Sequence, residues 1–550
     1  MKKDLTMKKS TFVTGAFITT LGIVISKILG ILYVIPFHAI IGETGGALYG
    51  YAYTIYLLFM SLSSAGIPLA ISRIVSEYQA LGYYNTKKRV FILGKRIALV
   101  LGIICFLIIT IFAPSLAKAV LGNVTGGNSL EDVTLVIRVI GTAILVVPVL
   151  SVYRGYFEGH RFMSAPSISQ VLEQIVRVLI IIFGSLMAIK TFNLDLTTAV
   201  GVALFGATAG ALVAYLYLVY KKLKNNRKFN ERIRPVNEPI VTDKAIIRKI
   251  VYYAIPFIMI DVFKTAYNYI DMTTVVKGLV NSVHYSAVDA ETIYSMLSTW
   301  ANKFNMIVLA ISTGVIVSLI PNVTESVVKK QEKEVNNKVN QALSVLLFLT
   351  IPMTLGISFL SKAIWTLFYG DSVFGPSVLS YYIFLGLIIG LFTCVITIIQ
   401  VLKDYKVVFI SLISGVLLKL LLNHNLLIAF SNMNLPPYYG FITASILGYL
   451  LSFVICMVVL QKKYKIKFEY LVKNLVDITC GSLIMILLLS VIKFVIPVYS
   501  TFRLNNLVII LVYAVIGAII YFVYAYFTGL TKKVFGKDII MVLKRVLTKK

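Results

Sequence analysis

Apolar stretches alternate with short polar or basic connections along the whole chain. Most stretches run for at least about 20 residues with few charges, the length that an α-helix needs to cross the hydrocarbon core of a bilayer. The pattern predicts an all-α polytopic membrane protein with about fourteen transmembrane helices. The predicted spans are 11–41, 47–76, 90–113, 133–153, 167–189, 197–220, 246–276, 292–321, 339–361, 377–402, 407–430, 438–460, 471–496 and 505–528.

Composition leads to the same class of protein. Hydrophobic residues make up 59% of the 550 residues and charged residues only 14%, against roughly 25% charged residues in ordinary soluble domains. Such a chain cannot bury its apolar residues in a water-soluble core, so its solvent must be lipid. The four histidines are far apart in the sequence and lack the spacing of metal ligands, so no metal site is predicted.

Basic residues are distributed unevenly between the two sides of the predicted membrane topology. Of the 52 lysines and arginines, 39 lie on the termini and on alternate connections, 7 on the opposite connections and 6 within spans. Such an excess marks the cytoplasmic side, so both termini are predicted in the cytoplasm. Topology and contact with anionic membrane lipids then explain the net charge of +29, and no nucleic-acid partner is predicted.

An internal repeat suggests how the spans are grouped. Gly66 precedes Glu77 by eleven residues at the end of the second span, and Gly314 precedes Glu325 by the same number at the end of the eighth. A parallel repeat of this kind predicts two six-helix lobes with a cleft between them, followed by two further helices. The predicted parts are an N-lobe at 1–222, a basic cytoplasmic linker at 223–245, a C-lobe at 246–461, the last two spans at 462–530 and a basic cytoplasmic tail at 531–550.

Six basic side chains lie inside predicted spans. A charge at the centre of a bilayer costs at least about 2.5 kcal/mol on insertion scales. We therefore expect these side chains to face a partner or a wet cavity, which makes them candidates for function. They are Lys27, Arg73, Arg177, Lys264, Lys303 and Lys419.

Lys27 and Lys303 are interpreted as cavity lysines. The sequence has no acidic residue between Asp4 and Glu43 that could pair with Lys27 within its own helix, and it has none within a turn of Lys303. Snorkelling is the alternative for Lys27, but a lysine at mid-span is far from either interface.

The seventh span carries a polar face. Asp261, Lys264, Asn268 and Asp271 follow one another at spacings of three, four and three residues. Asp261 and Lys264 can neutralise each other as a structural pair. The alternatives are the wall of a cavity, to which Lys264 contributes a cation, and a coupling-ion site formed by Asp261 and Asp271.

Two further sets of charges are predicted as gate or structural ion pairs. Glu173 precedes Arg177 by four residues in the order that favours an ion pair on a helix. Arg73 and Glu77 lie at the cytoplasmic end of the second span, where they could form a gate or anchor the helix at the interface.

Lysines from three spans give the predicted site its chemistry. If Lys27, Lys264 and Lys303 converge in a cleft of low dielectric, their fixed positive charge attracts anions strongly. A diphosphate is the obvious class of ligand, because lysine binds phosphate as a point charge.

Enzymes and ATP-driven pumps lack support in the sequence. It contains no G-x-x-x-x-G-K-[ST] motif, no connection long enough for a nucleotide-binding domain and no nucleophile–base cluster. We expect no enzymatic activity and no cofactor, with a monovalent cation such as Na⁺ or H⁺ as a candidate coupling ion.

Several segments of the chain carry a family resemblance. They are Ile25-Ser26-Lys27-Ile28-Leu29-Gly30, Ala65-Gly66-Ile67-Pro68 through Ser76-Glu77-Tyr78, Arg154-Gly155-Tyr156-Phe157-Glu158-Gly159, Ser169-Gln170-Val171-Leu172-Glu173-Gln174 and Ala301-Asn302-Lys303. Together they resemble the lipid II flippases of the MurJ type. The similarity covers most of the chain, and parts of it are similar to the Gram-positive branch, which includes the sporulation-linked stage V protein B group.

The resemblance implies a fold and a function. The fold is that of the multidrug, oligosaccharidyl-lipid and polysaccharide exporters, with two lobes, a central cationic cavity and a groove at the last two spans for a polyprenyl tail. The implied function is to flip undecaprenyl-diphosphate-linked peptidoglycan precursor across the bacterial plasma membrane by alternating access. Lys27 and Lys303 would bind the diphosphate, whereas Tyr33 stands where relatives have a second arginine. Membrane potential or ions would drive transport, with Asp261 and Asp271 as coupling candidates.

Partners and alternatives follow from the same resemblance. The protein would act as a monomer, with cell-wall synthesis proteins as candidate partners. A flippase for another lipid-linked oligosaccharide, such as a teichoic acid or capsule precursor, is a close alternative. A multidrug or cation antiporter of the same fold would need carboxylates, yet the first span offers Lys27 and no acid. A membrane scaffold without transport would not need lysines at mid-span.

Overall fold

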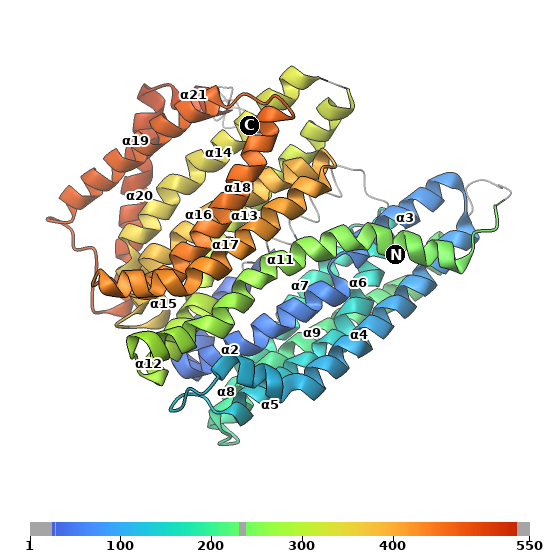
Figure 1. The fold of residues 1–550 in the computed structure, drawn as a ribbon, viewed down its shortest axis with the longest axis horizontal. Coiled ribbons are helices and arrows are strands. Elements are labelled where there is room, and N and C mark those ends of the chain that lie inside the picture. The colour runs from blue at the N-terminus through green and yellow to red at the C-terminus, as the bar shows by residue number, and fades with distance from the viewer. Residues whose placement is uncertain (1–21, 23–24, 28, 230–237, 330, 536–550) are drawn as a thin grey trace, which may run out of the picture. The chain divides into compact units, whose positions relative to one another are not determined.

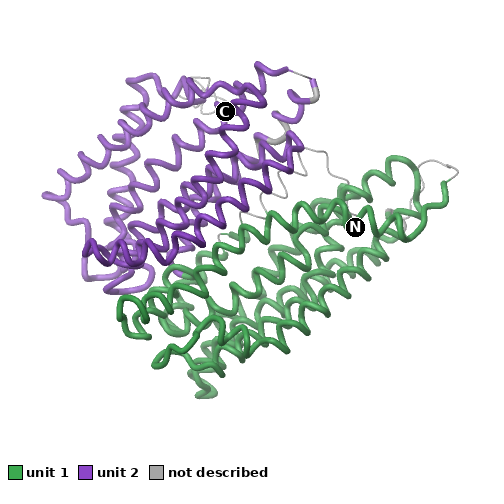
Figure 2. The backbone as a smooth tube through the Cα atoms, viewed as in Figure 1, with its two compact units in different colours: residues 1–299 green, residues 300–550 purple. Residues whose placement is uncertain are grey.

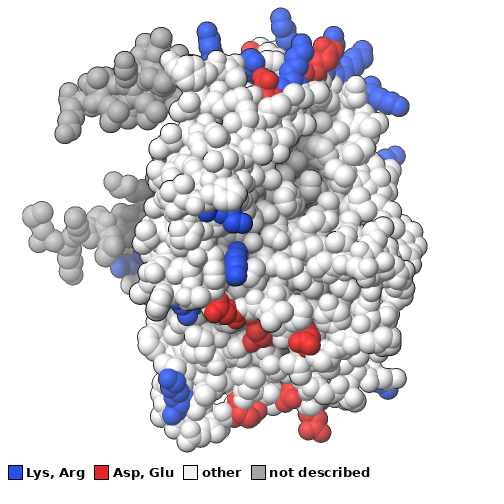
Figure 3. All heavy atoms as spheres, turned by 90° about the vertical axis from the view of Figure 1, so that its left-hand side faces the viewer, with Lys and Arg blue, Asp and Glu red and all other residues white. Residues whose placement is uncertain are grey.

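The computed structural model describes residues 22, 25–27, 29–229, 238–329 and 331–535. Every regular element in this part of the chain is helical (Figure 1). The chain divides into two compact units, residues 1–299 and 300–550 (Figure 2). Over the face drawn in Figure 3, charged side chains are sparse, and lysine and arginine gather towards its upper end. The protein is an all-helical, multi-pass membrane protein.

The described helices match the predicted spans closely. Eleven of them are long and apolar enough to cross a membrane, and they correspond to spans two to six and nine to fourteen. The other three predicted spans are the first, described only from residue 22, the seventh and the eighth. The predicted first, seventh and eighth spans carry Lys27, Lys264 and Lys303, respectively.

The first unit contains the following elements. They are α2 (Val34–Ser64), α3 (Ile67–Leu81), α4 (Tyr84–Leu121), α5 (Leu130–Gly141), α6 (Ala143–Gly159), α7 (Ser164–Leu179), a π-helical turn (Ile180–Gly184), α8 (Ser185–Lys190), α9 (Leu196–Lys224), α10 (Asn226–Phe229), α11 (Asp243–Val283) and α12 (Ala287–Ser295). A second π-helical turn, Met296–Trp300, leads into the second unit.

The break between the first and second spans lies inside α2. Gly42 has φ 63° and ψ −164° there, a conformation that a side chain would disfavour. The residues before Gly42 therefore complete the first span, and those after it begin the second. This break agrees with the connection predicted between residues 41 and 47.

Helix α11 packs within the first unit, against α2, α3 and α4. Gly66 allows the closest approach, because a Cβ atom at this position would lie 2.2 Å from the carbonyl oxygen of Ala254. The hydroxyls of Ser61 and Thr265 are 3.2 Å apart and join α2 to α11. The predicted C-lobe began at residue 246, whereas the compact units divide at 299/300, so α11 and α12 lie in the first unit.

The second unit contains the remaining elements. They are α13 (Ala301–Val328), α14 (Glu332–Phe359), α15 (Ser361–Tyr369), α16 (Gly375–Val401), α17 (Tyr405–Asn432), α18 (Tyr439–Lys462), α19 (Glu469–Ile492), α20 (Arg503–Phe527) and α21 (Leu530–Phe535). The predicted basic tail lies outside the described residues from position 536 onward, and so does 230–237 of the predicted linker.

The two units repeat the same pairs of packed helices. In the first unit α3 packs on α6, α4 on α6, α6 on α9 and α7 on α9. In the second unit α13 packs on α16, α14 on α16, α16 on α18 and α17 on α18. Counted in spans, both sets pair two with four, three with four, four with six and five with six. This recurrence supports the internal repeat, which as a six-plus-six division stays a prediction.

Candidate functional site

A buried ionic network occupies the middle of the first unit. The Glu173 carboxylate accepts a hydrogen bond from Arg177 at 2.9 Å and one from Arg154 at 2.7 Å. Arg154 also donates to the Ser169 hydroxyl at 3.0 Å. The three charged side chains are only 14–16% exposed. Two guanidinium groups thus share one carboxylate, which leaves the network with a net positive charge.

Tyrosines of α2 lie beside this network. The Arg177 guanidinium interacts electrostatically with the hydroxyls of Tyr49, Tyr53 and Tyr56, and its Nε has no hydrogen-bond partner among the described residues. Tyr49 and Tyr53 stack with ring centroids 5.5 Å apart. The result is a cation flanked by aromatic hydroxyls on the face that α2 turns toward α7.

Arg73 and Glu77 take different partners. Glu77 accepts from the Lys249 ammonium at 2.7 Å, which joins α3 to α11. The Arg73 guanidinium lies over the ring of Tyr253, 4.3 Å from its centroid, in a cation–π contact. Both predicted residues therefore connect α3 to α11 through separate contacts, and none of the ion pairs among the described residues joins Arg73 to Glu77.

The polar face of α11 keeps its predicted residues close together. Asp261 and Lys264 interact electrostatically, but among the described ion pairs they do not form one within 4.0 Å. Asp271, further along the helix, is close enough to Tyr294 to act electrostatically on its hydroxyl. Asp261 is exposed in the structure, whereas Lys264 and Asp271 are partly buried.

Lys27 lies where the first span packs on α7. A Cβ atom added to Gly22 would lie 2.9 Å from the Ser167 Cβ, and one added to Gly30 would lie 3.6 Å from Nε2 of Gln174. These contacts place the first span along the helix that carries Glu173 and Arg177. The Lys27 side chain is partly buried.

Lys303 belongs to the second unit and lies in the first turn of α13. The π-helical turn at Met296–Trp300 comes directly before that helix. Such turns inside helices often mark functional positions. The structure therefore places Lys27 and Lys264 in one unit and Lys303 in the other, and their convergence stays a prediction.

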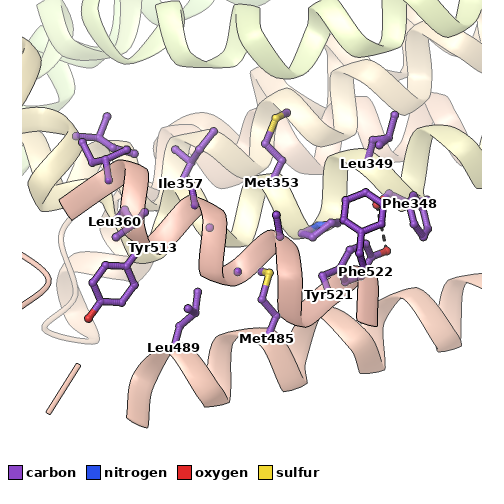
Figure 4. Close-up of a pocket in the computed structure, with 17 residues that line it drawn as sticks. Phe348, Leu349, Met353, Ile357, Leu360, Met485, Leu489, Tyr513, Tyr521 and Phe522 are labelled. Atoms are coloured by element: carbon purple, nitrogen blue, oxygen red, sulfur yellow. Dashed lines mark hydrogen bonds between the residues drawn. The ribbon is translucent and has the colours of Figure 1, made fainter. Parts of the chain in front are cut away.

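An apolar groove of about 330 Å³ lies in the second unit (Figure 4). Its walls come from α14, α15, α19 and α20, which include both of the last two predicted spans. Small residues, Gly356 and Gly517 among them, leave room between bulkier walls such as Met353 and Met485. The lining is almost entirely hydrocarbon and sulfur, so the groove suits an apolar chain.

Hydrogen bonds hold the helices together at both ends of the groove. At one end the Tyr521 hydroxyl donates to the carbonyl of Phe348 at 3.1 Å (Figure 4). At the other end the Tyr513 hydroxyl donates to the carbonyl of Ile496 at 2.6 Å. Arg503 also donates to a carbonyl at the end of α15, at 2.7 Å. Between these ends, the residues that line the groove are almost all apolar, so an inserted chain would compete mainly with the packing of apolar side chains.

A second buried carboxylate lies outside the predicted spans of the first unit. Glu291, which is 2% exposed, accepts hydrogen bonds from the backbone N–H of Asn128 at 3.0 Å and from its side-chain amide at 2.7 Å. Burial raises the pKa of the Glu291 carboxyl to about 7. Nearby, Glu43 accepts from the Ser295 hydroxyl at 2.6 Å. These contacts fasten α12 to the α4–α5 connection and to α2.

Sequence reasoning missed Arg154, Lys249 and Glu291. Arg154 directly follows the fourth predicted span, 133–153, so it is not among the basic residues expected inside spans. Lys249 is 172 residues from its partner Glu77, a distance that no local pattern bridges. Glu291 sits at the edge of a predicted span, where a carboxylate ordinarily indicates only a helix end.

The fold and its charged interior define the class of protein. The structure is similar to one titled lipid II flippase MurJ in an inward closed conformation, with a TM-score of 0.64, 15% identity and 93% of this chain and 98% of that chain covered. It is also similar to a multidrug resistance MATE family transporter of the MOP superfamily, with a TM-score of 0.63, 12% identity and 82% and 98% covered. The protein thus has the fold of the MOP superfamily of transporters.

Sequence comparison narrows this class. Residues 12–324 match the family described as polysaccharide biosynthesis protein, and residues 298–424 match the MatE family. The chain is 32% identical to the lipid II flippase MurJ of Bacillus subtilis (strain 168) over 540 residues, which cover 96% of this chain and 97% of that one. It is also 32% identical to stage V sporulation protein B of the same organism, over 40% of this chain and 42% of that one.

The chain belongs to the MurJ family of lipid II flippases, a family of transporters and not of enzymes.

Proposed function

We propose that this protein flips lipid II, an undecaprenyl-diphosphate-linked peptidoglycan precursor, from the inner to the outer leaflet of a bacterial plasma membrane by alternating access. The observation that carries the proposal is the 32% identity to a lipid II flippase over 96% of the chain. The excess of basic residues on one set of connections supports an orientation with both termini in the cytoplasm.

The chemistry of such a substrate fits two features of the chain. A lipid-linked diphosphate has an apolar tail, and the groove between α14, α15, α19 and α20 offers an apolar surface for it. It also has an anionic group that must cross the membrane interior, where an ion is costly unless fixed charges replace its water. In the proposed cavity Lys27 and Lys264 of the first unit and Lys303 of the second supply those charges.

The proposed energy coupling rests on the polar face of α11. Asp261 and Asp271 lie on the helix that also carries Lys264, and Asp261 interacts with that lysine electrostatically. A monovalent cation or a proton that binds this face would alter the charge of the cavity. Substrate release and ion binding could then be linked through one helix.

The test is made in a Bacillus strain in which every other lipid II flippase has been removed. Wild-type protein should restore lipid II on the outer leaflet, measured by accessibility to an external lipid II-binding reagent. Lys27→Ala and Lys303→Ala should abolish this exposure at normal membrane levels, because each removes a cation that the diphosphate needs.

Charge-conserving Lys27→Arg and Lys303→Arg variants are the matched controls, and each should keep a substantial part of the activity. Full activity of both alanine variants would overturn the cationic cavity. Failure of the wild-type protein to expose lipid II, together with rescue of a strain that lacks a teichoic acid or capsule flippase, would reassign the substrate. The description of the matching family as polysaccharide biosynthesis proteins makes that second strain worth including.

A further inference from the structure

The connection between α18 and α19 forms a hollow of about 860 Å³ on the second unit. Lys465, Lys467 and Lys473 line it, together with Gln461 and a single carboxylate, Glu469. All three lysines are exposed. The hollow therefore carries a local excess of positive charge and opens to the surroundings.

Contacts with α14 fix the backbone of this connection. The Lys467 backbone N–H donates to Asn336 Oδ1 at 2.8 Å, and the Lys467 carbonyl accepts from Asn340 Nδ2 at 2.9 Å. Asn340 is only 3% exposed, so the clamp is anchored in the interior of the unit. Asn336 and Asn340, which lie one turn apart on α14, thus bind both backbone polar groups of Lys467.

Two neighbours of Lys467 add to this rigidity. Ile466 is 2% exposed and serves as an apolar anchor, and its N–H donates to the carbonyl of Leu460 at 3.1 Å. Lys465 adopts φ 53°, a left-handed conformation that is uncommon for a residue with a side chain. The connection is therefore folded around a defined hollow, and a ligand would not have to order it on binding.

The start of α19 adds partial positive charge to the lysines. Phe468 is the N-cap residue and gives no side-chain hydrogen bond to the first turn of the helix. Amide groups left free at a helix N-terminus favour an anion, and cationic side chains close by strengthen that preference. Lys463 is not available for this purpose, because it pairs with Asp404 at 2.5 Å.

Exposed apolar side chains continue from the hollow along α19. Tyr470 is 47% exposed, Val472 55% and Val476 57%. The Tyr470 hydroxyl donates to the carbonyl of Lys533 at 2.6 Å, which holds its ring at this level. A basic hollow that borders an apolar helix face matches a molecule with an anionic head and hydrocarbon chains. A soluble anion would use only the hollow.

We propose that the α18–α19 connection binds the phosphate headgroup of an anionic phospholipid, with the acyl chains lying along the exposed face of α19. The clamped loop presents Lys465, Lys467 and Lys473 to the phosphate. The placement of this lipid in the inner leaflet rests on the orientation given in the proposed function. Because α19 also lines the apolar groove through Met485 and Leu489, the bound lipid stabilises one wall of that groove.

Binding is measured on the full-length protein in nanodiscs made of phosphatidylcholine with or without phosphatidylglycerol. Native mass spectrometry counts the phosphatidylglycerol molecules that remain after detergent release, and thermal unfolding gives the stabilisation. The wild-type protein should retain the anionic lipid and unfold at a higher temperature with it. The triple variant Lys465→Gln, Lys467→Gln, Lys473→Gln should bind at least tenfold more weakly.

A second triple variant, Lys88→Gln, Lys403→Gln, Lys406→Gln, removes three exposed lysines from other connections of the same predicted side and is the matched control. Equal loss of phosphatidylglycerol from both variants would reduce the effect to general surface charge and overturn the site. Displacement of the lipid by millimolar inorganic phosphate, or retention of a polyprenyl phosphate in place of phosphatidylglycerol, would also overturn it. None of these measurements uses transport, so their failure is distinct from failure of the proposed function.

Discussion

Single residues show where this protein places charge inside its first unit. Glu173 is shared by Arg154 and Arg177, and all three side chains are largely buried. Removal of one partner from a buried ion pair costs about 3–5 kcal/mol, because the other charge remains without compensation. Glu173 is therefore the critical member of the network, since its loss would leave two guanidinium groups facing each other, whereas loss of Arg154 still leaves the pair with Arg177.

Glu291 makes the stability of the first unit depend on pH. Its carboxyl has a pKa of about 7 in the folded protein, above the value of about 4.3 expected for an exposed glutamate. A raised folded-state pKa means that the native state holds its proton more tightly, so stability falls as pH rises from about 4.3 to beyond 7. We expect wild-type protein in detergent to lose up to roughly 3 kcal/mol of stability from this group over that range.

Glu291→Gln should remove this part of the pH dependence, because the amide carries no charge at any pH. The measurement is the unfolding temperature of both proteins between pH 5 and 8. Glu325→Gln is the control, since that carboxylate is exposed and pairs with Lys329 at the surface. Parallel profiles for wild type and Glu291→Gln would show that Glu291 is not the titrating group.

At the scale of elements, the attachment of α11 to the first unit depends on close backbone contact. A Cβ atom at Gly66 would lie 2.2 Å from the Ala254 carbonyl oxygen, and backbone cannot move aside as a side chain does. Overpacking of this kind typically costs 1–3 kcal/mol. We expect Gly66→Ala to lower the unfolding temperature and to loosen α11, detected as faster reaction of a cysteine introduced on that helix.

The repeat provides the control for this variant. Gly314 occupies the corresponding position of the second half, and no described atom lies within 4 Å of a Cβ built there. Gly314→Ala should be neutral or stabilising by about 0.5–1 kcal/mol, because alanine loses less backbone entropy than glycine in a helix. Equal destabilisation by the two substitutions would argue against the close approach of α3 and α11.

Hydrophobic patterning was sufficient to predict the helices but not their partners. The length of apolar runs gave the spans, and Gly42 broke the first from the second where the sequence indicated. The pairing of Glu173 with Arg177 followed from their spacing on one helix. The contacts of Arg154, Arg73 and Glu77 did not, because they depend on which helices pack together, and ridges of similar apolar residues fit many neighbours equally well.

At the scale of the whole molecule, the role of the groove in transport can be tested independently of the candidate lysines. A substitution inside the groove changes the space for the tail and leaves those lysines in place. Ala518 lines the groove, and a phenylalanine in its place would fill part of the 330 Å³. Ala518→Phe should reduce outer-leaflet lipid II severalfold while leaving expression and folding unchanged, since the new ring occupies the space proposed for the tail.

Val515→Phe adds the same ring on the outward face of α20, where Val515 is 58% exposed and does not line the groove. It should transport as well as wild type. The readout is the external lipid II-binding reagent in the depleted strain. Equal activity of the two phenylalanine variants would mean that the tail does not enter this groove during transport.

The dimensions of the groove also limit what it can hold. Its 330 Å³ is near the lower end of the roughly 300–1,000 Å³ found for sites that enclose a drug-sized ligand, and an eleven-unit isoprenoid is much bulkier than such a ligand. Most of the isoprenoid tail would therefore stay among the acyl chains of the bilayer, and only a short stretch of it would bind in the groove. Lipid II analogues with shortened isoprenoid tails should then be transported as readily as the natural substrate, provided that the stretch of tail bound in the groove is present.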